Sequence, residues 1–273
     1  MTDTRILFAD LDGTLLDDDK NVSAEDLRSI NEMISAGHRF VIATGRPLYS
    51  AKVVARELDL FREGIFLAAS NGGLIYDCGT DTVISKTHLD DDTVRAFFEA
   101  ASAEGLHIHT YTDDDIVSLR ETEELKVYSR AIKMPYRILS RIPEDLPGPP
   151  PKLIVMSIKE NSRRVLEDFE ARHKDLAAGK VQSVFSNDYL LEYLPVGVSK
   201  GKALIRLCDI MGIRVENSVA CGDEANDIPM LDAAGTAVVM KNGTDEAKSH
   251  ADYVTDHTNN ENGMTEIIHR FIL

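Results

Sequence analysis

Two aspartates, Asp10 and Asp12, directly follow the short apolar run Ile6–Ala9. An apolar run of this length that ends at a glycine turn predicts a buried strand. Carboxylates at the carboxyl end of such a strand lie where open α/β sheets bind ligands. If the extended geometry persists, residues two positions apart point the same way, so that one carboxylate can attack a substrate while the other transfers a proton. A solvated acidic turn has the same composition, so the segment alone leaves both interpretations open.

The composition limits the class of protein. With 273 residues and 43% hydrophobic content, the chain can form one large domain or two. Its formal net charge of −16 argues against a nucleic-acid partner. No apolar run is long enough to cross a bilayer, and the first strand begins too early for a signal peptide, so we expect a cytoplasmic protein. The three cysteines, Cys78, Cys208 and Cys221, lack metal-type spacing and are expected to be reduced.

The N-terminal part of the chain alternates strands and helices. Ser23 is a suitable cap for a helix that Gly37 ends, and the apolar run Phe40–Ala43 follows as a second strand. A strand, a helix and a strand of these lengths predict a βαβ unit. We therefore expect an α/β core with a parallel, doubly wound sheet, to which Ile65–Ala69 adds a third strand.

The alternation breaks in the middle of the chain. Helices are expected near 91–103 and 162–173, with strands near 106–111, 153–158, 181–185 and 190–194, and a proline-rich loop over 143–151. This mixed order predicts an α+β domain inserted at residues 83–194, with a core domain formed by residues 1–82 and 195–273. His107 and His109 could share a metal, although two histidines without a third ligand are more typical of ordinary strand residues.

Three further segments place polar groups at strand ends or helix starts. Thr44-Gly45-Arg46-Pro47 follows the second strand and could bind an anion through its N–H groups, or could be an ordinary turn. Ser199 caps a helix that begins Lys200-Gly201-Lys202. A lysine in the first turn opposes the helix dipole, so Lys200 or Lys202 is a candidate for binding an anion, although a solvated lysine remains open. The third segment contains Asp223 and Asp227, which follow the strand Val219–Cys221.

In a parallel sheet the carboxyl ends of the strands share one edge, so we expect these groups to meet in one cleft. Carboxylate oxygens are ligands that Mg²⁺ prefers. Attack by Asp10 on a phosphate dianion has to overcome roughly 4 kcal/mol for each like-charge pair at about 4 Å, which Mg²⁺ and Lys200 would offset. We therefore expect an aspartyl-phosphate at Asp10, with Asp12 acting first as an acid and then as a base. That role requires a raised pKa for Asp12.

Four segments, taken in order, resemble the signature motifs of the haloacid dehalogenase superfamily. They are Asp10-Leu-Asp-Gly-Thr14, Ala43-Thr-Gly-Arg46, Ser199-Lys-Gly201 and Gly222-Asp-Glu-Ala-Asn-Asp227. The long insert and Ser70-Asn-Gly-Gly73 resemble the Cof-type phosphatase branch of that superfamily, which has a class IIB cap. The resemblance covers essentially the whole chain.

The resemblance implies a Rossmann-like core with a large α/β cap, which the inserted residues 83–194 would form. It also implies Mg²⁺-dependent hydrolysis of a small phosphorylated metabolite, such as a sugar phosphate or pyridoxal phosphate. It implies that Asp10 is the nucleophile and that Asp12 is the acid/base. It assigns catalysis to Asp10 and Asp12. It assigns phosphate or substrate binding to Thr44, Gly45, Arg46, Lys200 and Asn226. It assigns Mg²⁺ binding to Asp10, Asp12, Asp223 and Asp227. Asp12 would bind the metal through its backbone carbonyl.

Two other functions fit parts of the pattern. A sugar phosphomutase of the same superfamily could use the same four motifs. A signalling receiver also combines acids, a threonine and a lysine, but it is about half this length and has no use for Asp12 or for a cap.

Substrate specificity is expected from cap residues that face the cleft, with Glu192 and Arg46 as candidates. The sequence specifies neither the metabolite nor the oligomeric state.

Overall fold

The computed structural model describes residues 4–273, which form two compact units. The first unit comprises the chain up to residue 46 together with Ala51–Ser85 and Ser199–Leu273. The second comprises Pro47–Ser50 and Lys86–Val198. Each unit is built on its own sheet.

The first unit contains a sheet of eight strands in the order β14-β13-β12-β1-β2-β3-β4-β5. It is parallel from β14 to β3, and β4 is antiparallel to β3. The strands are β1 (Ile6–Asp10), β2 (Arg39–Ala43), β3 (Ile65–Ala69), β4 (Leu74–Asp77), β5 (Thr82–Lys86), β12 (Ser218–Gly222), β13 (Thr236–Val239) and β14 (Tyr253–Val254). The α/β fold and the parallel-dominated sheet expected from the sequence are confirmed.

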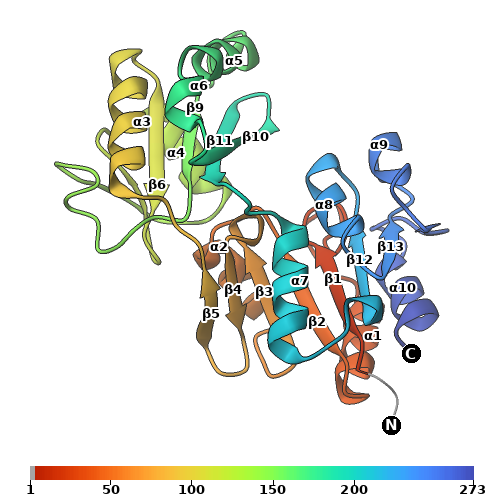
Figure 1. The fold of residues 1–273 in the computed structure, drawn as a ribbon. Helices are drawn as coiled ribbons and strands as arrows, with labels where there is room; N and C mark the ends of the chain where they lie inside the picture. The colour runs from red at the N-terminus through yellow and green to blue at the C-terminus, as the bar shows by residue number, and fades with distance from the viewer. Residues whose placement is uncertain (1–3) are drawn as a thin grey trace. The chain divides into compact units, whose positions relative to one another are not determined.

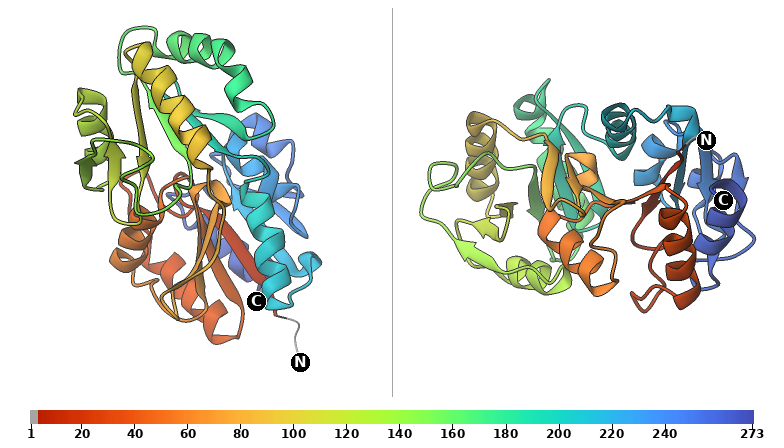
Figure 2. Two further views of the ribbon diagram at one scale, coloured as in Figure 1. Left: turned by 60° about the vertical axis from the view of Figure 1, so that its left-hand side comes forward. Right: turned by 90° about the horizontal axis from the view of Figure 1, so that it is seen from below.

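Both faces of this sheet are covered, which explains why its central strands are apolar throughout. On one face lies α7 (Lys200–Met211), as Figure 1 shows. Its Leu204 and Leu207 belong to the same buried core cluster as Phe8 of β1. On the other, α1 (Ala24–Ser35) and α10 (Gly263–Phe271) run side by side (Figure 2). The remaining helices are α2 (Leu48–Glu57), α8 (Ile228–Leu231) and α9 (Asp245–Lys248), with short 3₁₀ turns at Ser70–Gly72, Val215–Asn217 and Ala225–Asp227.

Helix caps follow the sequence pattern. The Ser23 hydroxyl accepts a hydrogen bond from the Asp26 N–H (2.9 Å), and the Ser199 hydroxyl accepts one from the Lys202 N–H (3.1 Å). Gly212 ends α7 in the left-handed conformation, as a C-terminal glycine commonly does. The start of α7, and with it Lys200, is therefore fixed by local sequence.

The second unit contains six strands in the order β10-β11-β9-β6-β7-β8. Helices α3 and α5 pack on one face through Phe97 and Phe169, and α4 packs on the other through Leu125 and Tyr128. The elements are α3 (Asp91–Ala103), β6 (His107–Tyr111), β7 (Ile116–Ser118), α4 (Glu123–Ala131), β8 (Tyr136–Ile138), β9 (Leu153–Met156), α5 (Ser162–Arg172), α6 (Lys174–Ala177), β10 (Val181–Asn187) and β11 (Leu190–Pro195).

All three cysteines are buried as free thiols. Across residues 4–273, the structure contains no helix with both the length and the apolar character that a bilayer crossing requires.

Candidate active site

Three neighbouring strands end at the same edge of the first sheet. Strand β1 ends at Asp10 and lies between β2, which Thr44 follows, and β12, which Asp223 follows. Because all three strands are parallel, these three residues lie along one edge.

An acidic cluster lies at this edge. Asp10, Asp223 and Asp227 are all buried, and one carboxylate oxygen from each lies within 4.8 Å of the others. The Lys200 Nζ donates to Asp10 Oδ1 and to Asp227 Oδ1, the latter at 2.5 Å. Lys200 is only 1% exposed, so its positive charge is directed entirely into the cluster.

Two glycines allow this approach. Gly13 has φ +81°, and a Cβ built there would lie 3.0 Å from Asp223 Cγ. At Gly201 a Cβ would collide with the carbonyl of Pro229, so only glycine lets the start of α7 lie against α8, the helix that directly follows Asp227. Between Gly13 and β12, the Thr14 hydroxyl donates to Asp223 Oδ1 at 2.8 Å.

The electrostatics of the cluster show an excess of negative charge. Burial, followed by the charge of Asp227, raises the pKa of Asp10 to about 8 against the opposing effect of Lys200. Burial also raises the pKa of Asp223 to about 6, although the hydrogen bond from Thr14 opposes this rise. Three buried carboxylates thus share one lysine, and a hard divalent cation with oxygen ligands fits this donor set.

The three carboxylates are not equivalent as potential ligands. Asp227 uses Oδ1 for Lys200 and Oδ2 to accept hydrogen bonds from the Asp223 N–H (3.0 Å) and the Glu224 N–H (3.2 Å). Asp227 therefore holds both Lys200 and the Asp223 loop in place. Asp10 and Asp223 are the better placed of the three to bind a cation directly.

Asp12 lies outside this cluster. Strand β1 ends at Asp10, so the extended geometry does not continue to Asp12. Arg46 holds the Asp12 carboxylate in a bidentate contact, Nε to Oδ2 at 3.0 Å and Nη2 to Oδ1 at 2.7 Å, and Lys20 Nζ donates to Oδ1 at 2.9 Å. Burial alone would raise the pKa of Asp12, but these contacts outweigh it and lower the pKa. The raised pKa required of a general acid is therefore absent in this arrangement.

The residues predicted to bind the phosphate or the substrate differ in burial and in their contacts. Thr44 is buried, and its hydroxyl accepts a hydrogen bond from the Arg46 N–H (3.1 Å). Asn71 lies against Gly45 and donates its N–H to the Thr44 carbonyl at 3.0 Å. Asn226 is exposed on the turn Ala225–Asp227.

Glu192 lies in the second unit, where it is buried and pairs with Lys152 at 2.6 Å. Sequence reasoning gave no role to Thr14, Lys20 or Asn71. Thr14 and Asn71 lie inside segments quoted for the resemblance, which is the one signal that could have identified them.

These features define an α/β enzyme core with its candidate active site at the carboxyl edge of the sheet. The chain belongs to the haloacid dehalogenase-like hydrolases, whose sequence profile matches residues 7–268.

The relatives span nearly the whole chain. The 5-amino-6-(5-phospho-D-ribitylamino)uracil phosphatase YwtE of Bacillus subtilis is 29% identical over 292 residues, covering 98% of each chain. The pyridoxal phosphate phosphatase YbhA of Escherichia coli is 29% identical over 265 residues, covering 92% of this chain and 93% of its own. The crystal structure of a haloacid dehalogenase-like hydrolase from Bacteroides thetaiotaomicron aligns with a TM-score of 0.89 at 29% identity, over 98% of this chain and 99% of that one.

Proposed function

We propose that this protein is a Mg²⁺-dependent phosphomonoester hydrolase that acts on a small phosphorylated metabolite through an aspartyl-phosphate at Asp10. The observation that carries the proposal is the buried cluster of Asp10, Asp223 and Asp227 around Lys200. Phosphatase-named relatives that span the chain support the same reaction. The three free, buried cysteines fit a cytoplasmic protein.

Asp10 is the proposed nucleophile. Its carboxylate would attack phosphorus, forming the Asp10 O–P bond while the bond from phosphorus to the ester oxygen breaks. Lys200 holds the attacking group and opposes its charge repulsion with the incoming phosphate. Mg²⁺, held by Asp10, Asp223 and the backbone carbonyl of Asp12 with Asp227 in support, would stabilise negative charge on the phosphoryl oxygens.

Asp12 is the proposed acid and base, and Arg46 explains how it becomes available. A phosphate dianion competes with the Asp12 carboxylate for the Arg46 guanidinium, because both are bidentate acceptors. Transfer of Arg46 to the substrate would remove the contact that lowers the pKa of Asp12. Asp12 could then protonate the leaving alkoxide and later accept a proton from the water that hydrolyses the aspartyl-phosphate.

The remaining residues are proposed to bind the substrate. The Thr44 hydroxyl and the backbone at Gly45 would hold the phosphoryl group together with Arg46 and Lys200, while exposed Asn226 would contact the substrate. Residues 83–194 would act as a cap whose exposed side chains select the metabolite; Glu192, named from the sequence as a candidate, is buried against Lys152 and is not one of them. The relatives are named for two different phosphorylated metabolites, so the substrate class is proposed only as small and phosphorylated.

The test is a panel of phosphorylated metabolites assayed for phosphate release with Mg²⁺. We expect turnover that EDTA abolishes and added Mg²⁺ restores, and no turnover by Asp10→Asn. Asp19→Asn, which changes an exposed acid nearby in the chain, is the matched control and should keep full activity. Metal-independent hydrolysis, or undiminished turnover by Asp10→Asn, would contradict the proposal.

A further inference from the structure

Two asparagine side chains hold the turn that follows Asp10. Asn242 Nδ2 donates to the Gly13 carbonyl at 2.8 Å, and Asn259 Nδ2 donates to the Leu16 carbonyl at 2.9 Å. The two asparagines are also joined to each other, because the Asn259 N–H donates to Asn242 Oδ1 at 3.1 Å. One connected set of amides therefore holds two carbonyls of a single turn.

The turn needs these external donors. The turn's own hydrogen bonds, from the Leu15 N–H to the Asp10 carbonyl (3.2 Å) and from the Leu16 N–H to the Leu11 carbonyl (2.8 Å), do not use the Gly13 carbonyl, while Asp12 and Leu16 are joined by a parallel bridge within the turn. Leu16 and Asn259 are both buried, where an unpaired carbonyl is costly. Asn242 thus fixes the peptide plane between Gly13 and Thr14, and Asn259 fixes the peptide plane that follows Leu16, so both act on the turn whose Thr14 bonds Asp223.

The loop that carries Asn242 also contacts the other side of the acidic cluster. The Thr244 N–H donates to the Asp223 carbonyl at 2.8 Å. Asn242 and Thr244 are two residues apart, so the same short loop is bonded both to the turn after Asp10 and to Asp223. A displacement of this loop would change the separation of the two carboxylates best placed to bind a cation.

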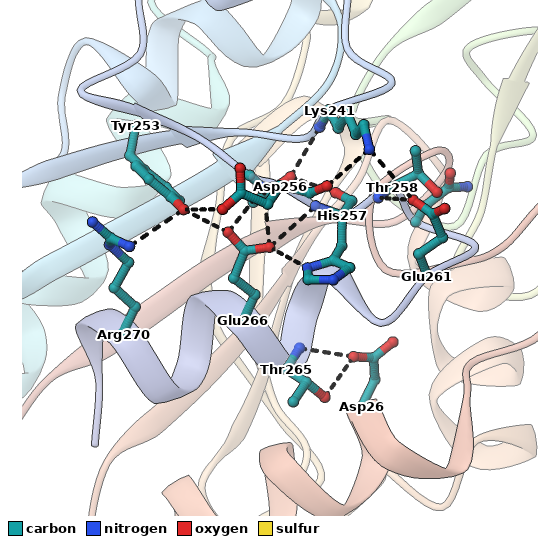
Figure 3. A network of polar contacts seen from close by, with 12 residues as sticks. Asp26, Lys241, Tyr253, Asp256, His257, Thr258, Glu261, Thr265, Glu266 and Arg270 are labelled. Atoms are coloured by element: carbon teal, nitrogen blue, oxygen red, sulfur yellow. Dashed lines mark hydrogen bonds and ion pairs between the residues drawn. The ribbon is translucent and has the colours of Figure 1, made fainter.

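A separate polar network anchors the segment that carries Asn259 (Figure 3). On α10, the Glu266 carboxylate accepts hydrogen bonds from the Asp256 N–H (3.0 Å), the His257 N–H (3.2 Å) and the Tyr253 hydroxyl (2.7 Å). Lys241 Nζ donates to the Asp256 carbonyl at 2.9 Å. The backbone immediately before Asn259 is therefore fixed from a helix, which makes the asparagine a rigid support for the turn.

We propose that Asn242 and Asn259 are positioning residues that set the geometry of the Asp10–Leu16 turn and thereby the affinity of the acidic cluster for a divalent cation. This inference rests on the proposed function for its kinetic consequence. It goes beyond that function because it gives a role to two residues outside all four motif segments. Neither asparagine bonds to Asp10, Asp223 or Asp227 directly, so both act through the backbone of the turn.

The test combines Asn242→Ala and Asn259→Ala with three readouts. We expect the Mg²⁺ dissociation constant, measured by calorimetry without substrate, to rise about 10- to 100-fold, as is typical when a group supporting a metal ligand is lost. We expect kcat at subsaturating Mg²⁺ to fall with little change in the substrate KM, and saturating Mg²⁺ to restore part of it. Hydrogen exchange at the Leu15 and Leu16 amides should become faster.

Asn242 is exposed, so Asn242→Ala tests the proposal even if loss of the buried Asn259 impairs folding. Asn260→Asp is the control, because it changes the adjacent exposed residue and keeps the oxygen that accepts from the Asp18 N–H. Unchanged Mg²⁺ affinity and amide exchange in Asn242→Ala would overturn the proposal. A wild-type protein that hydrolyses no phosphate ester would instead contradict the proposed function and leave the Mg²⁺ and exchange readouts decisive for the asparagines.

Discussion

The Asp12 carboxylate is held by Arg46 through two charge-assisted hydrogen bonds and by Lys20 through one. The two partners differ in exposure, since the Arg46 side chain is 23% exposed and that of Lys20 is 58% exposed. Solvent screening weakens the Lys20 contact, so Arg46 is the main restraint on Asp12. We propose that the same guanidinium binds the substrate phosphate, because a guanidinium matches a phosphate in bidentate geometry.

Arg46→Gln should therefore lower kcat/KM about 10- to 100-fold, because a charged, bidentate hydrogen bond is worth about 1.5–3 kcal/mol. Lys20→Gln should change kcat/KM by no more than about twofold, since exposed pairs contribute about 0–1 kcal/mol. Steady-state kinetics at saturating Mg²⁺ measure both variants. Equal effects of the two substitutions would show that Arg46 has no particular role in binding the phosphate.

Within the second unit, strand β6 carries a buried polar chain. His107 Nε2 and His109 Nδ1 are 2.9 Å apart, His107 Nδ1 lies 2.9 Å from the Thr122 hydroxyl, and His109 Nε2 lies 3.3 Å from the Tyr111 hydroxyl. Each ring nitrogen therefore has a partner inside the unit. These contacts support the interpretation of the two histidines as ordinary strand residues.

Burial lowers the pKa of His107 from 6.5 to about 4, against the opposing charge of Glu124. Below pH 6.5 the His107 imidazole binds a proton in the unfolded chain but not in the folded protein. The contribution of His107 to the free energy of unfolding is therefore constant above pH 6.5 and decreases as the pH falls from 6.5 toward 4. The loss is on the order of 3 kcal/mol. Urea unfolding of wild type and His107→Gln at pH 7 and pH 4.5 should show a weaker pH dependence in the variant.

The control for this prediction is His88→Gln, because His88 is exposed. It should keep the wild-type pH dependence. If His107→Gln shows the same loss of stability between the two pH values as wild type, the acid sensitivity arises elsewhere in the chain.

Long, capped elements could be predicted from the sequence because their signals are local. Helices α1 and α7 have serine caps and a regular apolar stripe, and β1, β2 and β3 are uninterrupted apolar runs. Helix α4 and strands β7 and β8 were missed. In α4 only Leu125 and Tyr128 are buried, and each of the two strands has three residues, so none provides a periodic pattern of useful length.

Within the candidate site, too, some features could be predicted from the sequence and others could not. Residues at strand ends could be identified because the βαβ pattern places those ends at one edge. The contacts that orient them could not, because they join distant residues: Arg46 is 34 positions from Asp12, Asp223 is 209 from Thr14, and Asn242 is 229 from Gly13. Such pairs depend on the tertiary course of turns, which one sequence does not reveal.

For the whole molecule, repulsion within the acidic cluster lowers the free energy of unfolding, and a bound cation would remove that repulsion. Asp10, Asp223 and Asp227 are buried together with one lysine in a chain whose net charge is already −16. Burial of like charges destabilises the folded state, and functional sites commonly retain such a cost. Binding of Mg²⁺ to the folded state alone adds stability by mass action, about 2.7 kcal/mol when its concentration is 100 times the dissociation constant.

Asp10→Asn should therefore have opposite effects with and without metal. In EDTA at pH 9, above the pKa of about 8 that burial gives Asp10, the variant should be more stable than wild type by about 0.5–2 kcal/mol, because one buried charge is removed while Lys200 keeps its bond to Asp227. In excess Mg²⁺ the order should reverse, since wild type gains the binding energy and the variant has lost a ligand. Urea unfolding in both buffers, with Asp19→Asn as the exposed control, measures the crossover. Equal stabilisation of wild type and Asp10→Asn by Mg²⁺ would mean that the cation binds somewhere other than this cluster.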